Sequence, residues 1–147
     1  MITVGELMTR DLYTLKSNAS VLDCHALMAS SRIKHIPIIS EEDVLLGIVS
    51  ESDVLEALNS SLKPTDDTSL AILEATAPVT DIMTKHVATV SPKDQLRRAG
   101  LDMVKRKIGC LPVVDAGKLV GIITETDFVE TAISLLEQLE LAEPTQD

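Results

Sequence analysis

The chain is 147 residues long and carries 13 Lys and Arg against 23 Asp and Glu, a formal net charge of -10 at pH 7. This acidic balance repels the phosphate backbone of nucleic acids. One Tyr, one Phe and no Trp leave too few aromatic rings to stack bases. The length fits one ordinary domain, or two very small ones that share a core. We therefore expect a folded protein with no nucleic-acid partner.

The sequence also argues against secretion and against insertion in a membrane. Residues 1–6 lack the basic and apolar regions of a signal peptide, and no apolar run approaches the length of a membrane helix. Cys24 and Cys110 lie far apart with no C-x-x-C partner, which is typical of free, buried thiols in a reducing compartment. We expect a cytoplasmic protein with no metal site.

Each half of the chain shows the same predicted elements: short strand, helix, strand, turn, strand, helix. In the first half they are expected at residues 13–15, 21–31, 35–39, 45–49 and 52–62. The helix carries apolar residues at spacings of three and four, whereas the second and third strands are nearly continuous apolar runs and should be buried. Residues 63–77 are predicted to form a linker with a short helix at 68–77.

The second half repeats the first. Three segments recur in the same order: Met8-Thr9 as Met83-Thr84, residues 36–39 as 111–114, and residues 47–53 as 121–127. The spacing between the copies shortens by one residue before the third segment, inside a predicted turn at residues 40–44 and 115–118. The sequence therefore predicts a tandem duplication.

A single repeat of this size buries too little apolar surface to be stable alone. The two copies should therefore pack sheet against sheet around a shared core. The predicted fold class is α+β, with two β-α-β-β-α repeats related by pseudo-two-fold symmetry. The expected boundaries are residues 1–62 for the first repeat, 63–77 for the linker, 78–141 for the second repeat and 142–147 for a C-terminal tail.

One repeated motif indicates chemistry: Ser50-x-x-Asp53 and Thr124-x-x-Asp127, each after a strand that contains glycine. It places a hydroxyl at a helix N-cap and a carboxylate one turn inside. A carboxylate can accept hydrogen bonds from both hydroxyls of a ribose, and the helix N-terminus favours a nearby phosphate. The same spacing also forms a capping box, in which the carboxylate only bonds the N-cap N–H. Spacing alone favours the capping box and leaves both roles open.

The complete set of motifs resembles the cystathionine beta-synthase (CBS) domain family, and specifically a tandem CBS pair, the Bateman module. The resemblance rests on residues 79–84, 108–115 and 121–127 with their counterparts in the first copy, and it covers nearly the whole chain. It implies clefts between the paired domains that bind adenosine-containing ligands such as AMP, ADP, ATP or S-adenosylmethionine. It also implies regulation of a partner protein.

The resemblance implies two clefts, each combining the Ser/Thr-x-x-Asp of one copy with the first strand and pre-proline segment of the other. One cleft would use Ser50, Asp53, Met83, Ala88, Ile108, Gly109 and Cys110. The other would use Thr124, Asp127, Met8, Tyr13, Ile33, Lys34 and His35. The apolar members would enclose the base. Several of them, Met8, Met83, Ile33 and Ile108, fit a purely structural core role equally well.

The two clefts differ at the pre-proline segment. Lys34 and His35 stand where family members that bind phosphorylated nucleotides carry basic residues, whereas the second copy has Gly109 and Cys110. We therefore expect the cleft beside Lys34 and His35 to favour ligands with more phosphates. With an ordinary pKa of about 6.5, His35 should gain charge as pH falls from about 7.5 to 6. The alternative is that this pair is simply solvated at a strand edge.

Enzyme motifs are absent from the sequence, including the P-loop, G-x-G-x-x-G, H-E-x-x-H and G-x-S-x-G patterns. We expect a standalone, non-enzymatic module without a catalytic cofactor. It should sense an adenosine nucleotide and signal to an unidentified target protein by conformational change. The alternative is a structural dimerisation or interaction module with empty clefts. Apolar residues within 54–58 and 128–136 predict a homodimer.

Overall fold

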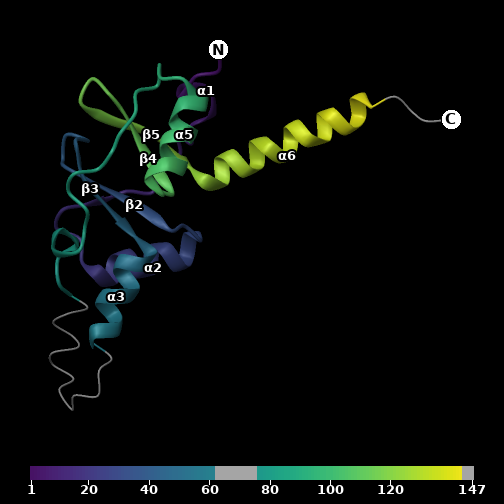
Figure 1. Ribbon diagram of the computed structural model, residues 1–147. Helices are drawn as coiled ribbons and strands as arrows, with labels where there is room; N and C mark the ends of the chain where they lie inside the picture. The colour runs from purple at the N-terminus through teal and green to yellow at the C-terminus, as the bar shows by residue number, and fades with distance from the viewer. Residues whose placement is uncertain (62–75, 144–147) are drawn as a thin grey trace.

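The computed structural model describes residues 1–61 and 76–143 of the chain (Figure 1). The first half contains α1 (Val4–Leu7), β1 (Leu15–Lys16), α2 (Val21–Ser31), β2 (His35–Ile39), β3 (Leu45–Ser50) and α3 (Glu51–Ser61). The second half contains η1 (Val79–Asp81), α5 (Leu96–Arg106), β4 (Cys110–Asp115), β5 (Lys118–Thr124) and α6 (Glu125–Ala142). Most of the predicted linker with its short helix, and most of the predicted tail, lie outside the described residues.

Helix α2 has its predicted bounds, and local hydrogen bonds show why. Ser20 caps the helix, because its Oγ accepts a hydrogen bond from the Asp23 N–H at 3.1 Å and its own N–H donates to Asp23 Oδ2 at 2.9 Å. The helix ends at Arg32, which adopts the left-handed conformation with φ 55°. Helix α5 ends in the same way at Lys107, also with φ 55°. Equivalent helices in the two copies thus end with the same backbone geometry.

The first strand begins later than the sequence predicts. β1 runs parallel to β2 with Leu15 opposite Ile38, and Leu15 packs against the core of the first half. Tyr13 is half exposed and does not pair. The predicted start at residue 13 is wrong because an aromatic residue favours a strand only where a neighbouring strand is within reach.

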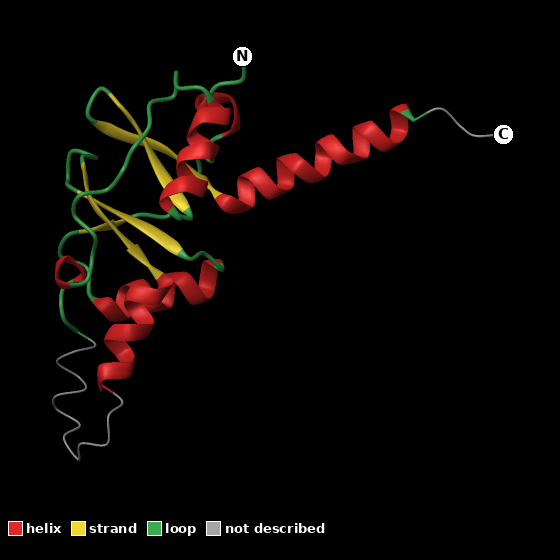
Figure 2. Ribbon diagram, viewed as in Figure 1, coloured by secondary structure: helices red, strands yellow, loops and turns green. Residues whose placement is uncertain are grey.

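The strands form two small sheets. β2 lies between β1 and β3, and β4 pairs with β5 in an antiparallel hairpin. Figure 2 shows the strands of both sheets between two layers of helices, with α2 and α3 on one outer side and α1 and α5 on the other. The predicted α+β fold class, with two repeats packed sheet to sheet, is confirmed.

The two repeats exchange their opening segments. Thr9 forms two backbone hydrogen bonds with Ile122 on β5, at 2.9 and 3.0 Å. Thr84 forms the equivalent pair with Ile48 on β3, also at 2.9 and 3.0 Å. The residues before β1 therefore pair with the second half, and residues 78–84 pair with the first.

The core consists of two aliphatic clusters, one in each half. The first cluster is Ala19, Val21, Cys24, Met28, Ile36, Ile38, Val49, Val54 and Val79. The second is Val4, Met8, Leu96, Ala99, Met103, Leu111, Val113 and Ile123. Val79 enters the first cluster from the second copy, while Val4 and Met8 enter the second cluster from the first copy. Neither repeat completes its core alone.

Glycine permits this exchange. A Cβ on Gly121 would lie 2.5 Å from Met8 Sδ, and a Cβ on Gly47 would lie 2.7 Å from both Met83 Sδ and the Thr84 carbonyl oxygen. These separations are too short for any side chain larger than hydrogen. Both methionines therefore lie directly over a strand of the opposite repeat.

Helix α6 extends away from the rest of the molecule (Figure 1). Among the described residues, its contact with the body lies near its start, where the Phe128 ring lies against Gly100 of α5. None of its residues is buried, and large apolar side chains lie exposed along it: Val129, Ile133, Leu135, Leu136 and Leu139. Within residues 1–61 and 76–143, no helix combines the length and apolar character needed to cross a membrane.

Candidate functional site

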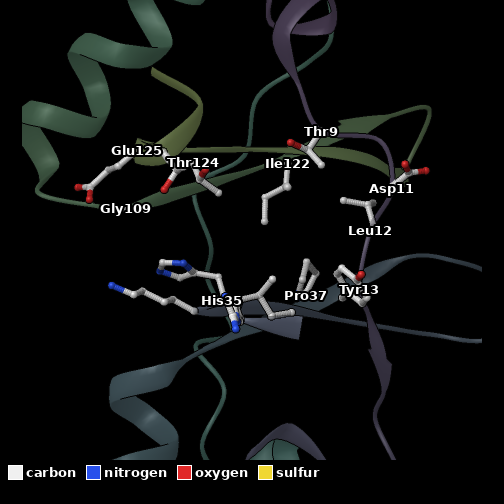
Figure 3. Close-up of a pocket in the computed structure, with 14 residues that line it drawn as sticks. Thr9, Asp11, Leu12, Tyr13, His35, Pro37, Gly109, Ile122, Thr124 and Glu125 are labelled. Carbon is white, nitrogen blue, oxygen red and sulfur yellow. The ribbon is translucent and has the colours of Figure 1, made fainter. Parts of the chain in front are cut away.

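A cavity of about 370 Å³ lies between the two halves of the molecule (Figure 3). Its walls come from the segment before β1, from the end of α2 with the start of β2, and from the junction of β5 with α6. The lining residues are Thr9, Asp11, Leu12, Tyr13, Arg32, Ile33, Lys34, His35, Pro37, Gly109, Ile122, Thr124, Glu125 and Thr126. Because both repeats contribute, a molecule bound here would contact both halves at once.

The cavity brings together most of the second predicted cleft. The predicted residues that line it are Tyr13, Ile33, Lys34, His35 and Thr124. Met8 does not reach it, because Met8 is buried over Gly121 in the core. Asp127 lies beside it, where its Oδ1 accepts a hydrogen bond from the hydroxyl of the lining residue Thr9 at 3.2 Å.

Thr124 and Asp127 form a complete capping box. Asp127 Oδ2 accepts hydrogen bonds from the Thr124 N–H at 2.8 Å and from the Thr124 hydroxyl at 3.2 Å. The Asp127 N–H donates to Thr124 Oγ1 at 3.4 Å. An ionised carboxylate has about four acceptor sites, so these bonds and the one from Thr9 leave capacity for a ligand hydroxyl. The structural role is therefore present and does not exclude binding.

The first copy repeats this geometry. The Ser50 N–H donates to Asp53 Oδ2 at 2.9 Å, and the Asp53 N–H donates to Ser50 Oγ at 3.1 Å. Both predicted motifs therefore cap the helix that follows them, α3 in the first half and α6 in the second.

The remaining residues of the first predicted cleft are divided among different surroundings. Met83 packs against the first core cluster, while Ala88 and Ile108 pack against the second. Cys110 is buried, and burial, with a smaller contribution from the Asp127 charge, raises the pKa of its thiol to about 12. Gly109 lines the cavity of the second cleft instead, since a Cβ there would lie 3.4 Å from His35 Cε1.

Several lining residues were not among those predicted: Thr9, Asp11, Leu12, Arg32, Pro37, Ile122, Glu125 and Thr126. Some carried a signal in the sequence. Glu125 and Thr126 fill the variable positions of the Thr124-x-x-Asp127 motif, and Arg32 precedes the predicted residue Ile33. Asp11 lies in the segment between the predicted residues Met8 and Tyr13.

The pKa of His35 differs from the ordinary value that the sequence analysis expects. Burial lowers its pKa below 6.5, and the Lys34 charge adds to that decrease. The carboxylates of Glu125, Asp53 and Glu51 oppose it in that order. The expectation of an ordinary pKa is wrong, because the sequence does not show that this imidazole is enclosed. His35 therefore gains its charge at lower pH than expected.

The cavity is also less basic than the sequence suggests. Two cationic side chains line it, Arg32 and Lys34, and two anionic ones, Asp11 and Glu125, share the lining. Formal charges near pH 7 thus balance, since the lowered pKa keeps His35 mostly neutral. Within the described ranges, no group of three His, Cys, Asp or Glu side chains is placed to hold a metal ion.

Comparison with known proteins shows what the chain resembles. The family model for the CBS domain matches twice, at residues 4–60 and 79–134. A candidate acetoin utilization protein (AcuB) from Vibrio cholerae is 42% identical with a TM-score of 0.82, and the match covers 98% of this chain and 99% of that one. CBSX2 of Arabidopsis thaliana in complex with AMP is 31% identical with a TM-score of 0.77, covering 92% and 99%.

A third structure contains other adenosine compounds. The CBS domain pair of protein MJ0100, in complex with 5'-methylthioadenosine and S-adenosyl-L-methionine, is 26% identical with a TM-score of 0.74, covering 89% of this chain and 99% of that one. The curated relatives are longer proteins. The chain spans 41% of the uncharacterized protein MJ1225 of Methanocaldococcus jannaschii, which is 32% identical and matches 86% of this chain. It spans 24% of the homoserine O-acetyltransferase of Methanococcus vannielii, which is 30% identical and matches 87% of this chain.

Proposed function

The chain belongs to the CBS domain family, and on this premise we propose that it is a regulatory module that binds an adenosine-containing ligand in the cavity between its halves. The main observation in support of this proposal is the cavity. Its volume of about 370 Å³ is that of a small-molecule site, and both copies of the repeat line it. Proteins of similar fold contain AMP in one case and 5'-methylthioadenosine with S-adenosyl-L-methionine in another.

The apolar part of the lining suits a flat purine ring. Tyr13 and Pro37 come from the first half, and Ile122 comes from β5 of the second, as Figure 3 shows. An aromatic ring and aliphatic side chains on opposite walls can enclose a base by stacking and dispersion contacts. We place the adenine of the ligand between these walls.

The polar part of the lining suits a ribose and a charged tail. Thr124 lines the cavity at the N-terminus of α6, and Asp127 lies beside it with acceptor capacity left for a ribose hydroxyl. The positive end of the helix dipole and the side chains of Arg32 and Lys34 would attract a phosphate or carboxylate on the tail. The role proposed for these residues is binding and not catalysis.

Regulation would follow from the position of the cavity. A ligand that contacts both halves stabilises whichever relative arrangement gives it the better contacts, and so shifts the population of conformations. The surface offered to an unidentified target protein then changes with the concentration of ligand.

Tyr13 makes the proposal directly testable, because it is the only tyrosine of the chain and it lines the cavity. In protein with isotope-labelled tyrosine, NMR gives one set of ring signals that reports on this site alone. Titration with AMP, ATP or S-adenosylmethionine is expected to shift these signals saturably. If none of them does so at millimolar concentration, the interaction module with empty clefts is the better description.

The exposed face of α6 supports a second, compatible role in self-association. Ile133, Leu136 and Leu139 lie at helical spacing on a helix that contacts the body only near its start. A helix this exposed gains little from tertiary packing within one chain, so a second copy that covers the apolar face would stabilise it. We therefore include a homodimer in the proposed function.

A further inference from the structure

Glu125 occupies an unusual place for an acidic residue in a site proposed to hold a nucleotide. It is the first residue of α6 and lines the cavity, and its backbone N–H donates to the Gly109 carbonyl at 3.1 Å. Its side-chain carboxylate carbon lies 3.6 Å from the position that a Cβ on Gly109 would take, and His35 Cε1 lies 3.4 Å from the same position. The carboxylate and the imidazole therefore approach each other over Gly109.

This arrangement puts a negative charge where a ligand phosphate would be drawn. The N-terminus of α6 attracts anions, yet the first side chain of that helix is itself an anion (Figure 3). Arg32 and Lys34 can offset one or two negative charges on the ligand. Each further phosphate faces Glu125, and Asp11 elsewhere in the lining, without another lining cation to oppose them.

We propose that Glu125 determines the charge selectivity of the cavity: it disfavours adenosine ligands with a di- or triphosphate tail relative to those with a single phosphate or a charge-balanced tail. This inference rests on the proposed function and deepens it. It opposes the expectation, drawn from Lys34 and His35 alone, that this cleft favours more phosphates.

A purely structural role for Glu125 makes a different prediction. An acidic residue in the first turn of a helix stabilises the helix through its dipole whether or not a ligand is present. Neutralising Glu125 would then lower the melting temperature slightly and leave the relative affinities of adenosine, AMP and ATP unchanged. The ratio of affinities for two ligands therefore separates the roles.

The test compares wild type, Glu125→Gln, Glu125→Asp and Glu137→Gln by titration with adenosine, AMP and ATP, following the Tyr13 ring signals. Glu125→Gln is expected to raise the affinity for ATP relative to AMP about tenfold and to change the affinity for adenosine less than twofold. Glu125→Asp keeps the charge and should keep the wild-type ratio. Glu137→Gln makes the same change in net charge on an exposed part of α6, away from the cavity lining, and should also keep that ratio.

The failures of the two proposals are distinguishable. If AMP binds normally and the ratio of ATP to AMP affinity is unchanged in Glu125→Gln, this inference is overturned and the proposed function stands. Equal changes for adenosine and ATP also overturn it, because they indicate a positioning role. If no adenosine compound shifts the Tyr13 signals in any of the four proteins, the proposed function is contradicted, and so is the inference that rests on it.

Discussion

The two Ser/Thr-x-x-Asp motifs share a local geometry and differ in their surroundings. Asp53 Oδ2 and Asp127 Oδ2 accept the N-cap N–H at 2.9 and 2.8 Å, so the two capping boxes share this hydrogen bond at nearly equal lengths. The carboxylate of Asp127 also bonds Thr9 from the other repeat and adjoins the cavity lined by Lys34 and His35. Duplication has kept the local cap while the residues facing each motif have diverged.

The helices that follow the two motifs differ as well. α3 buries Val54 in the first core cluster, whereas α6 buries none of its residues and extends as an 18-residue helix. The same capping signal thus begins one helix that belongs to the core and one that is available to a partner. The second half supplies the proposed contact surface on α6, whereas both halves line the proposed site.

The largest effect is expected from a substitution that tests whether α6, more than α3, mediates self-association. Ile133→Asp on α6 places a charge on the exposed apolar face and should weaken self-association more than 100-fold, about 2.7 kcal/mol or more. Leu55→Asp on α3 is the comparison, because Leu55 lies in the other apolar segment from which the homodimer is predicted and is exposed to a similar degree. A smaller effect at Leu55 than at Ile133 is expected if α6 provides most of the contact surface. Light scattering would then find wild type at about twice the 15.9 kDa of one chain and Ile133→Asp at one chain. A wild-type mass of one chain would contradict the homodimer.

The second prediction tests whether Asp127 contributes to ligand binding in the cavity while Asp53 does not. A ligand at 100 times its dissociation constant adds about 2.7 kcal/mol to stability, or roughly 5 to 10 °C in melting temperature for a chain of this size. Asp127→Ala should abolish this stabilisation by AMP at the cavity, and Asp53→Ala should retain it. Without ligand, each variant should lose about 1 kcal/mol, because each removes one capping box. Thermal melting with and without AMP measures these changes. Equal shifts in melting temperature with AMP in the two variants would contradict different roles for the two motifs.

A third prediction concerns the exchanged segments, where the halves are alike. Gly47→Ala and Gly121→Ala should both destabilise the protein by about 1 to 3 kcal/mol through overpacking against methionine. Gly47→Ala should cost more, because its Cβ would also lie 2.7 Å from a backbone oxygen, the Thr84 carbonyl, whereas the nearest backbone oxygen to Gly121 lies at 3.1 Å. Chemical denaturation measures both changes. Full tolerance of either substitution would show that the strands separate easily.

The smallest expected effect is the pH dependence that His35, in the second cleft, adds to the stability of the protein. Its folded-state pKa lies below 6.5, so the unfolded chain binds the proton more readily. The stability contributed by the neutral imidazole is fully present above pH 6.5 and is lost as pH falls from there through the lower folded-state pKa. His35→Gln should flatten this part of the stability curve measured by denaturation at successive pH values. The exposed His86→Gln is the control, and an unchanged curve in His35→Gln would contradict the assignment.

Elements whose causes are local could be predicted from the sequence. Apolar spacing and the Ser20 capping box define α2, and continuous apolar runs define β2 and β3, because each signal depends on neighbours within a few residues. The repeated motifs also indicated the duplication, the fold class and the family. The family resemblance implied that Tyr13, Ile33, Lys34, His35 and Thr124 share one cleft, and all five line one cavity. Their role in binding a ligand stays a prediction.

Other features depend on how distant parts of the chain pack together. Gly109 was assigned to the first cleft but lines the second, where a Cβ on it would lie 3.4 Å from His35 Cε1. Burial lowers the pKa of His35 against the opposing charges of Glu125 and Asp53, and the balanced charge of the cavity depends on Asp11 and Glu125, which are far apart in the sequence. Electrostatic energies depend on distance and solvent exposure in three dimensions, and the order of residues along a chain specifies neither.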